Sequence, residues 1–419
     1  MTPSGKPRNL VLCADGTCNA FGHSHSNVSR LLECIDLDKP SVQQVCYDQG
    51  IGTSRGENER IRTILKCPAA LRVLPPPDDT WWRPTRWFSK IKSMTHGYGL
   101  ETNVAQLYEA VAELYETGDR VFLFGFSRGA FTVRALAGLI WRYGIPSVEN
   151  RRRAAKLFGQ AWPMFIAGFQ DEGGVHAKRA EQFFEREGQR ECPIHFMGLW
   201  DTVKSYGGLS PTILPHLRHN PSVKNVRHAL ALNERRAWFE VTTWGWLDLD
   251  REPEAAFSRL IDAEIHEIKK QNIVEVWFSG CHSDVGGGDR CKVSNATAEI
   301  ALRWMLGEAK QEELLLNAAG NDVLAVPRSQ ERPRLCESRN LFWRLVELKQ
   351  RKCIDNSGRW PTTLTAKRGA SPRKPLDSAR DGTIWYHESV EDLSQFGTIP
   401  ALTKLKPYST KRAPAAPKK

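Results

Sequence analysis

The sequence predicts an α/β fold in which helices flank a mostly parallel central sheet. Short apolar runs of strand length recur along the chain, and segments of helical periodicity separate them. Most of these runs end in small or polar residues that are typical of strand-end loops. The runs lie at 9–14, 42–47, 121–124, 193–200 and 273–279. Parallel sheets carry their ligands at the carboxyl ends of the strands, so we expect functional groups there.

One serine lies in a context that predicts a nucleophile. The apolar run Val121–Phe124 leads directly into Gly125-Phe126-Ser127-Arg128-Gly129, and apolar residues at helical spacing follow. Where a buried strand turns sharply into a helix, only residues without Cβ fit beside a serine held at strained backbone angles. We therefore predict an α/β-hydrolase-like fold with Ser127 as nucleophile and with Gly125 and Gly129 as supporting residues.

A serine hydroxyl needs a base within hydrogen-bond reach and a carboxylate that orients this base. His282 is the first choice for the base, because it follows an apolar strand and opens a glycine-rich turn. His387 comes later in the chain and is the second choice. Asp201 ends a buried strand, so its carboxylate should face the same sheet edge as Ser127. Asp284 is more plausible as a residue that braces the turn after His282.

An oxyanion hole is expected at the same edge. Its first donor is the backbone N–H of Arg128, which directly follows the nucleophile. The loop Asp15-Gly16-Thr17 is the natural source of a second donor, since Gly16 lets the backbone approach a ligand closely. Asp15 would hold this loop in shape or serve as a metal ligand.

Composition narrows the class of protein. The 419-residue chain is long enough to bury a large core, and its ten cysteines form no Cys-x-x-Cys pair, so we expect reduced, buried thiols and no zinc site. The net charge of +11 favours anionic partners. No recognised module supports nucleic acid as a partner.

The N-terminus lacks a signal-peptide core, and no apolar run reaches the length of a membrane span. These two observations predict cytoplasmic synthesis.

We expect a catalytic domain over residues 1–310, with an inserted loop at about 65–95 and a helical cap at about 147–190. Residues 311–400 would extend the same domain. Residues 401–419 read as a basic, disordered tail, and the basic, proline-rich stretch 366–375 is also expected to be solvated.

The predicted inserted loop is rich in tryptophan and cations. Trp81, Trp82 and Trp87 alternate with arginine and lysine. Aromatic rings and cations of this kind suit transient contact with a membrane surface. The other interpretation is a loop that packs its aromatic rings onto the domain, and the sequence leaves both open.

Six motifs follow one another along the chain: LVLCADGTCN, YDQGIGT, GFSRGAFTVRALAGLI, GLWDTVKSYG, RHALALNERR and FSGCHSDVGGG. In this order they resemble one known family, the catalytic domain of the type VI secretion phospholipase effectors. The match runs from about Asn9 to Leu306, with a weaker echo at 387–390. Two positions depart from the family pattern: Cys18 stands where a tryptophan is usual, and Asn233 stands where an aspartate is common.

The resemblance implies a serine esterase that acts on the acyl chains of glycerophospholipids without a cofactor. It implies Ser127 as nucleophile, Asp201 as acid and His282 as base. It also implies delivery by type VI secretion, with a secretion-spike protein or an immunity protein as partner.

Two other functions compete with this one. Asp15, Asp201, His282 and Asp284 could form a metal cluster for phosphoester hydrolysis, although this leaves the serine unexplained. Alternatively, a hydrolase scaffold whose catalysis has lapsed could bind membranes or nucleic acid.

Overall fold

The computed structural model places part of the chain. The described residues are 7–16, 25–49, 69–74, 99–168, 175–203, 220–236, 239–244, 270–288, 294–325, 351–353, 362–364, 373, 383–390 and 404–408.

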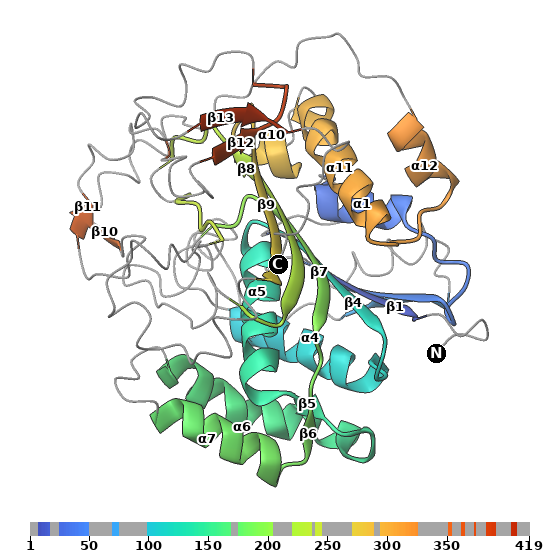
Figure 1. Cartoon of the computed structure of the whole chain (residues 1–419), viewed down its shortest axis with the longest axis vertical. Helices are drawn as coiled ribbons and strands as arrows, with labels where there is room; N and C mark the ends of the chain where they lie inside the picture. The colour runs from blue at the N-terminus through green and yellow to red at the C-terminus, as the bar shows by residue number, and fades with distance from the viewer. Residues whose placement is uncertain are drawn as a thin grey trace, which may run out of the picture.

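A single large sheet organises these residues (Figure 1). Its nine described strands follow the order β13-β12-β9-β8-β7-β4-β1-β2-β3, and every neighbouring pair is parallel. This confirms the predicted fold class. The strands are β1 Asn9–Ala14, β2 Gln43–Asp48, β3 Leu71–Val73, β4 Arg120–Phe126, β7 Ile194–Trp200, β8 Val223–Ala231, β9 Asn272–Phe278, β12 Thr383–Tyr386 and β13 Lys404–Pro407.

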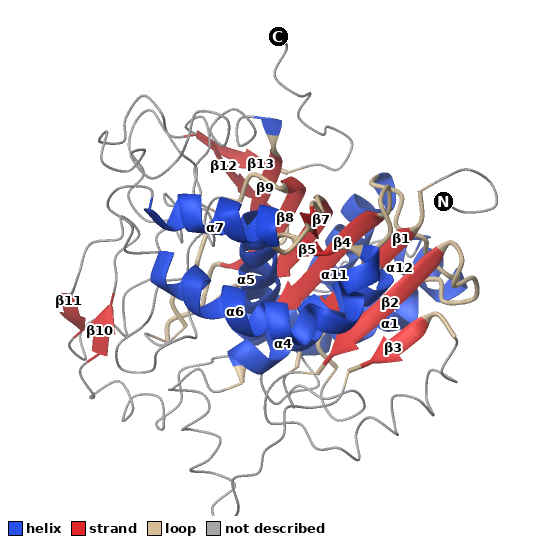
Figure 2. Cartoon of the chain, turned by 90° about the horizontal axis from the view of Figure 1, so that it is seen from below, coloured by secondary structure: helices blue, strands red, loops and turns tan. Residues whose placement is uncertain are grey.

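Helices cover both faces of the sheet, as Figure 2 shows. One group contains α4 (Leu100–Leu114), α5 (Arg128–Tyr143), α6 (Ala154–Ala167) and α7 (Val175–Arg186). The other contains α1 (Asn27–Cys34), α11 (Ser294–Gln311) and α12 (Ala318–Ala325). The remaining described elements are η1 Val148–Arg153, α10 His282–Gly286 and two antiparallel pairs, β5 Ile145–Pro146 with β6 Gln189–Arg190 and β10 Arg351–Cys353 with β11 Thr362–Leu364.

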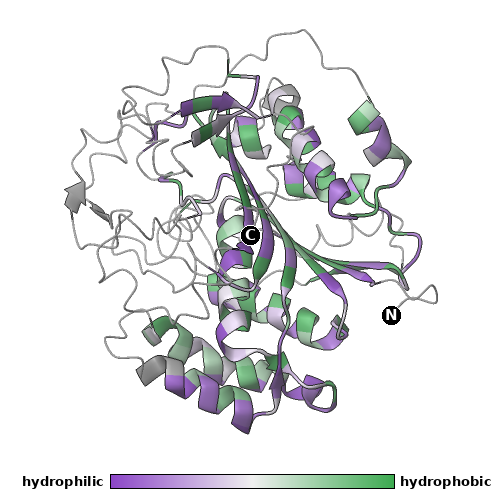
Figure 3. Ribbon diagram, in the orientation of Figure 1, coloured by the Kyte–Doolittle hydropathy of each residue, from purple (hydrophilic) through white to green (hydrophobic). Residues whose placement is uncertain are grey.

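A hydrophobic core lies on each face of the sheet, between the strands and one group of helices. The apolar runs of the central strands contribute to both cores. Successive side chains of a strand point to opposite faces of the sheet. In β4, Val121 and Leu123 pack with α4 and α5, whereas Phe122 and Phe124 pack with α1 and α11. The strands carry hydrophobic stretches next to hydrophilic ones, and the outer helices also mix both kinds of residue (Figure 3).

The strand register aligns the carboxyl ends on which the predicted site depends. Ala14 of β1 pairs with Gly125 of β4, and Phe126 of β4 pairs with Trp200 of β7. Ala231 of β8 pairs with Phe278 of β9. The residues that follow these strands consequently meet at one edge of the sheet.

Two sequence predictions differ in detail from the structure. The short strand β3 lies inside the predicted inserted loop, while Trp81, Trp82 and Trp87 lie outside the described residues. Residues 404–408 do not behave as part of a disordered tail: β13 pairs with β12, and Tyr408 is buried and donates to Glu308. The basic composition hid this strand, since its lysines lie on the sheet edge, where charge is favourable.

The predicted helical cap contains η1, α6 and α7. Tyr143 contacts the rings of Phe165 in α6 and Phe183 in α7. Because Tyr143 ends α5 and Ser127 precedes its start, these contacts lie at the end of α5 that is remote from Ser127. A covering role for this segment and the division into domains stay predictions.

The junction between β4 and α5 leaves no space for additional side chains. Ser127 has φ 57° and ψ −117°. A Cβ on Gly125 would lie 2.6 Å from the backbone of Ala130, and one on Gly129 would lie 2.0 Å from the carbonyl oxygen of Ala14. The two glycines let α5 start directly against the end of β1.

We predict that Gly129→Ala lowers the free energy of unfolding by about 1–3 kcal/mol or more, because a backbone oxygen cannot rotate away from the new methyl group. Urea unfolding measures the change. Gly159→Ala is the matched control: its Cβ would meet nothing within 4 Å in α6, so stability should stay equal or rise by up to about 1 kcal/mol. Equal stability of both variants would contradict the tight junction.

Candidate active site

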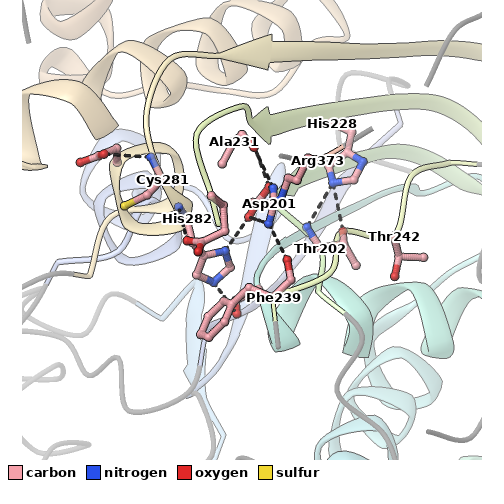
Figure 4. Close-up of polar contacts among 12 residues, drawn as sticks. Asp201, Thr202, His228, Ala231, Phe239, Thr242, Cys281, His282 and Arg373 are labelled. Atoms are coloured by element: carbon pink, nitrogen blue, oxygen red, sulfur yellow. Dashed lines mark hydrogen bonds and ion pairs between the residues drawn. The ribbon is translucent and has the colours of Figure 1, made fainter. Parts of the chain in front are cut away.

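Ser127, His282 and Asp201 form one chain of hydrogen bonds, and Figure 4 shows its part between His282 and Asp201. The Oγ of Ser127 lies 2.8 Å from Nε2 of His282, and Nδ1 of His282 lies 2.6 Å from Oδ2 of Asp201. With the carboxylate as acceptor, Nδ1 carries the proton and Nε2 accepts from the serine hydroxyl. The three residues come from the ends of β4, β7 and β9, which the sheet register brings together.

Two aromatic rings hold the imidazole of His282. The ring of Phe126 lies 4.6 Å from it between centroids, and the ring of Phe239 contacts it edge-on at 4.9 Å. Burial disfavours the charged imidazolium, and although Asp201 favours it, the pKa of His282 stays below its ordinary value. His282 is therefore neutral at neutral pH.

Asp201 is fully buried and has an unusual backbone, with φ 40°. The N–H of Ala231 donates to its Oδ1 over 2.9 Å. Burial alone would raise the pKa of Asp201, but the opposing charge of Arg373 and the hydrogen bond from His282 hold it below its usual range. Asp201 is an ionised carboxylate inside the protein.

Arg373 is a site residue that sequence reasoning missed. It lies within the basic stretch 366–375, which we expected to be solvated, yet its side chain is 6% exposed. It binds both carboxylate oxygens of Asp201 and donates to the carbonyl oxygens of Ala231 and Phe239. No spacing or periodicity separates this arginine from its basic neighbours, so only the tertiary structure identifies it.

The loop after β8 supports the histidine from a second direction. The backbone N–H of His282 donates to Glu234, and Arg236 binds both oxygens of the same carboxylate. Arg236 also lies 3.6 Å over the ring of Phe239. Burial opposes the charge of Glu234, but Arg236 prevails and lowers its pKa to about 2. Neighbouring Asn233 accepts from the N–H of Gly280 over 2.7 Å.

A second buried histidine fixes the backbone next to Asp201. Nε2 of His228 accepts from the N–H of Thr202 (Figure 4), and Nδ1 lies 2.8 Å from Glu275. Glu275 also accepts from the N–H of Trp244. The sequence pattern did not single out this histidine, because nothing local separates it from the other residues of β8.

Asp15 holds the loop after β1. Its carboxylate accepts from the hydroxyls of Ser26 and Tyr47 at 2.7 and 2.8 Å. It also accepts from the N–H of Gly16, the group that we predicted for the oxyanion hole. Ser26 pairs with Gly287 at the end of α10, so this network connects β1 to the helix that carries His282.

The other predicted residues have different partners. Asp284 accepts from the N–H of Cys281 and caps α10, so it braces the turn. His387 stacks on Phe278 at 4.6 Å, and its Nδ1 accepts from the N–H of Ser389. The geometry thus favours His282 over His387 as the partner of Ser127.

Two further features concern the part of the chain that the structure describes. Within it, no group of three or more His, Cys, Asp or Glu side chains has the arrangement of a metal site, so the alternative metal cluster gains no support. Among the same residues, no helix combines the length and hydrophobicity needed to span a bilayer.

A mostly parallel sheet between two helical layers, with a Ser–His–Asp arrangement at its strand ends, has the architecture of an α/β-hydrolase-like protein. A model of the family described as "T6SS, Phospholipase effector Tle1-like, catalytic domain" matches residues 8–308. The chain belongs to this family, as its motifs predicted.

The similar proteins are longer than this chain. The uncharacterized protein YEL023C of Saccharomyces cerevisiae is 28% identical over 241 residues, which cover 57% of this chain and 33% of the yeast protein. A crystal structure of an uncharacterized protein from Pseudomonas aeruginosa is 18% identical, with a TM-score of 0.38, and the match covers 74% of this chain and 47% of that one. The chain spans about a third of the first relative and about half of the second.

The charge of Glu234 should stabilise the fold in a pH-dependent way. Its pKa falls from an ordinary 4.5 to about 2 on folding, so the stabilisation is complete above pH 4.5 and is lost as the pH approaches 2. We predict that Glu234→Gln is less stable than the wild type by about 3 kcal/mol at neutral pH, and that the difference shrinks between pH 4.5 and 2.

Urea unfolding of both proteins across this pH range measures the difference. Glu113→Gln is the control, because Glu113 forms an exposed ion pair with Arg72 that should contribute less than about 1 kcal/mol. A stability difference for Glu234→Gln that does not change with pH would overturn the assignment.

Proposed function

We propose that this protein is a serine hydrolase that cleaves carboxylic esters, and that its substrates are the acyl esters of glycerophospholipids. The hydrogen-bond chain from Ser127 through His282 to Asp201 carries the proposal. Its distances are those required for a base that activates a hydroxyl and for a carboxylate that orients the base. Membership in a phospholipase effector family supports the lipid substrate.

The first half of the reaction forms an acyl-serine. Ser127 Oγ attacks the ester carbonyl carbon while Nε2 of His282 takes the hydroxyl proton. The carbonyl oxygen becomes an oxyanion. When the ester C–O bond breaks, His282 returns the proton to the departing alcohol oxygen. Asp201 stays ionised and stabilises the imidazolium that exists between these two steps.

The second half repeats this sequence with water. His282 takes a proton from water as the water oxygen attacks the acyl carbon, and it then protonates Ser127 Oγ when the acyl bond breaks. The products are a free fatty acid and the restored serine. No cofactor enters either half.

The oxyanion requires donors at the start of α5. The first N–H groups of a helix have no acceptor within the helix, and the helix dipole favours negative charge at this end. The N–H of Arg128 is the first donor in our proposal. A donor from the loop that contains Gly16 is the second, which requires the Gly16 N–H to exchange Asp15 for the oxyanion.

Contact with lipid and passage out of the cell are also part of the proposal. The charge of +11 suits anionic headgroups. Trp81, Trp82 and Trp87, with the cations around them, are the proposed surface for transient membrane contact. Family membership supports delivery by type VI secretion. A secretion-spike protein and an immunity protein are the partners that such delivery entails.

The main test uses Ser127→Ala. We expect this variant to lose at least about 10⁴-fold in the release of fatty acid from mixed phospholipid vesicles and of nitrophenol from a short-chain ester. EDTA should leave the wild-type rate unchanged. Ser147→Ala is the control and should keep full activity, because Ser147 lies beyond the far end of α5, directly before η1.

Activity that survives Ser127→Ala and disappears with EDTA would overturn the serine mechanism in favour of a metal cluster. Turnover of neither substrate by the wild type would favour the binding-protein interpretation. Preference for vesicles over the soluble ester would support the phospholipase assignment.

The buried base predicts the pH profile. Because the pKa of His282 lies below its ordinary 6.5, kcat/KM should keep more than half of its maximum at pH 6.5 and fall only at lower pH. Phe239→Ala removes one ring that covers the imidazole, so its acid limb should move to higher pH. Identical profiles for the two proteins would contradict burial as the cause.

A further inference from the structure

We propose that Arg373 is a positioning residue of the active site. It holds the Asp201 carboxylate in place, so that the negative charge of this carboxylate interacts with both Arg373 and His282. This inference rests on the proposed function. It assigns a role to a residue that neither the motifs nor the family match includes, since the match ends at residue 308.

The contact between Arg373 and Asp201 has the geometry of a specific pair. Two guanidinium nitrogens face two carboxylate oxygens, with Nη2 3.0 Å from Oδ2. Such a parallel pair of charge-assisted hydrogen bonds fixes the rotation of both planar groups, which a single contact does not. The side chains are 6% and 0% exposed, so water competes little for either.

The same guanidinium also connects two loops of the site. It donates to the carbonyl oxygens of Ala231 and Phe239 over 2.9 and 2.7 Å. Ala231 is also the residue whose N–H binds Asp201, and Phe239 is the residue whose ring contacts His282. Arg373 thereby positions the carboxylate that orients the base and the loop that covers it.

The charge of Arg373 matters as well as its shape. The charged groups around His282 are Asp201 and Glu234 on the negative side and Arg236 on the positive side, and Arg373 reaches it through Asp201. A carboxylate that already binds an arginine stabilises an imidazolium less. Arg373 consequently keeps Asp201 ionised while leaving His282 neutral and able to accept the serine proton.

The test compares Arg373→Gln, Arg373→Lys and a matched control. Arg373→Gln should lower kcat/KM by about 100-fold, mainly through kcat, because the base loses its orientation. Its acid limb should move to higher pH, since Asp201 then acts on His282 alone. Arg373→Lys keeps the charge without the two-point contact, so its rate should fall less and its acid limb should stay near that of the wild type.

Arg227→Gln controls for the loss of a buried arginine. Arg227 pairs with Glu308, their side chains are 3% and 2% exposed, and neither contacts the triad residues. This variant should keep the wild-type pH profile and a rate within about threefold, even where its melting temperature drops. All rates are measured at a temperature at which circular dichroism shows each variant folded.

A double-mutant cycle separates positioning from general support. If Arg373 acts through Asp201, Arg373→Gln should change the rate by less than about threefold in an Asp201→Asn background. A full additional loss in that background, or an Arg373→Gln profile that overlays the wild type, would overturn the inference.

The readout also distinguishes this inference from the proposed function. A fluorophosphonate probe bonds its phosphorus to Ser127 Oγ and releases fluoride, while the serine proton passes to His282. Labelling that is absent in Ser127→Ala but equally fast in the wild type and Arg373→Gln would remove Arg373 from the site and leave the serine hydrolase intact. Labelling that persists in Ser127→Ala would instead remove the proposed function.

Discussion

The candidate active site depends on one buried negative charge. Asp201 is fully buried, and an ionised carboxylate inside a protein is costly unless hydrogen bonds and an opposite charge compensate it. The N–H of Ala231, the imidazole of His282 and the guanidinium of Arg373 supply this compensation from three separate parts of the chain. Because all three groups bind the same carboxylate, a shift of any one of them changes the hydrogen bonds of the other two.

The parallel sheet makes this convergence feasible. All described neighbouring strands of the sheet run in the same direction. The residues that follow β4, β7 and β9 therefore leave the sheet at the same end. The steric limits at Gly129 then set α5 directly against the end of β1. Ser127 has a positive φ, and its hydroxyl lies against Nε2 of His282. The tight packing around Ser127 maintains this strained backbone conformation.

The segment that matches the family contains most of the residues of the candidate site, but not all of them. The matched segment, residues 8–308, contains Ser127, Asp201 and His282 together with the Glu234–Arg236 pair that supports the histidine. Arg373, β12 and β13 lie beyond it, and all three belong to the folded protein: the strands extend the sheet, and the arginine binds Asp201. Among the described residues beyond the match, these two strands and this arginine therefore contact the sheet and the candidate site.

The sequence by itself determined the elements that depend on local chemistry. Continuous apolar runs marked the central strands, and two glycines around a serine marked the turn after β4, because strand burial and steric limits at that turn constrain nearby residues. Asp201 and His282 were identifiable because each ends such a run. Only the tertiary structure placed His282, rather than His387, against Ser127, and only it revealed the contacts of Arg373, His228 and Glu234. These contacts join residues that are far apart in the chain. A buried arginine or glutamate that binds a site residue has no distinguishing pattern in the sequence next to it.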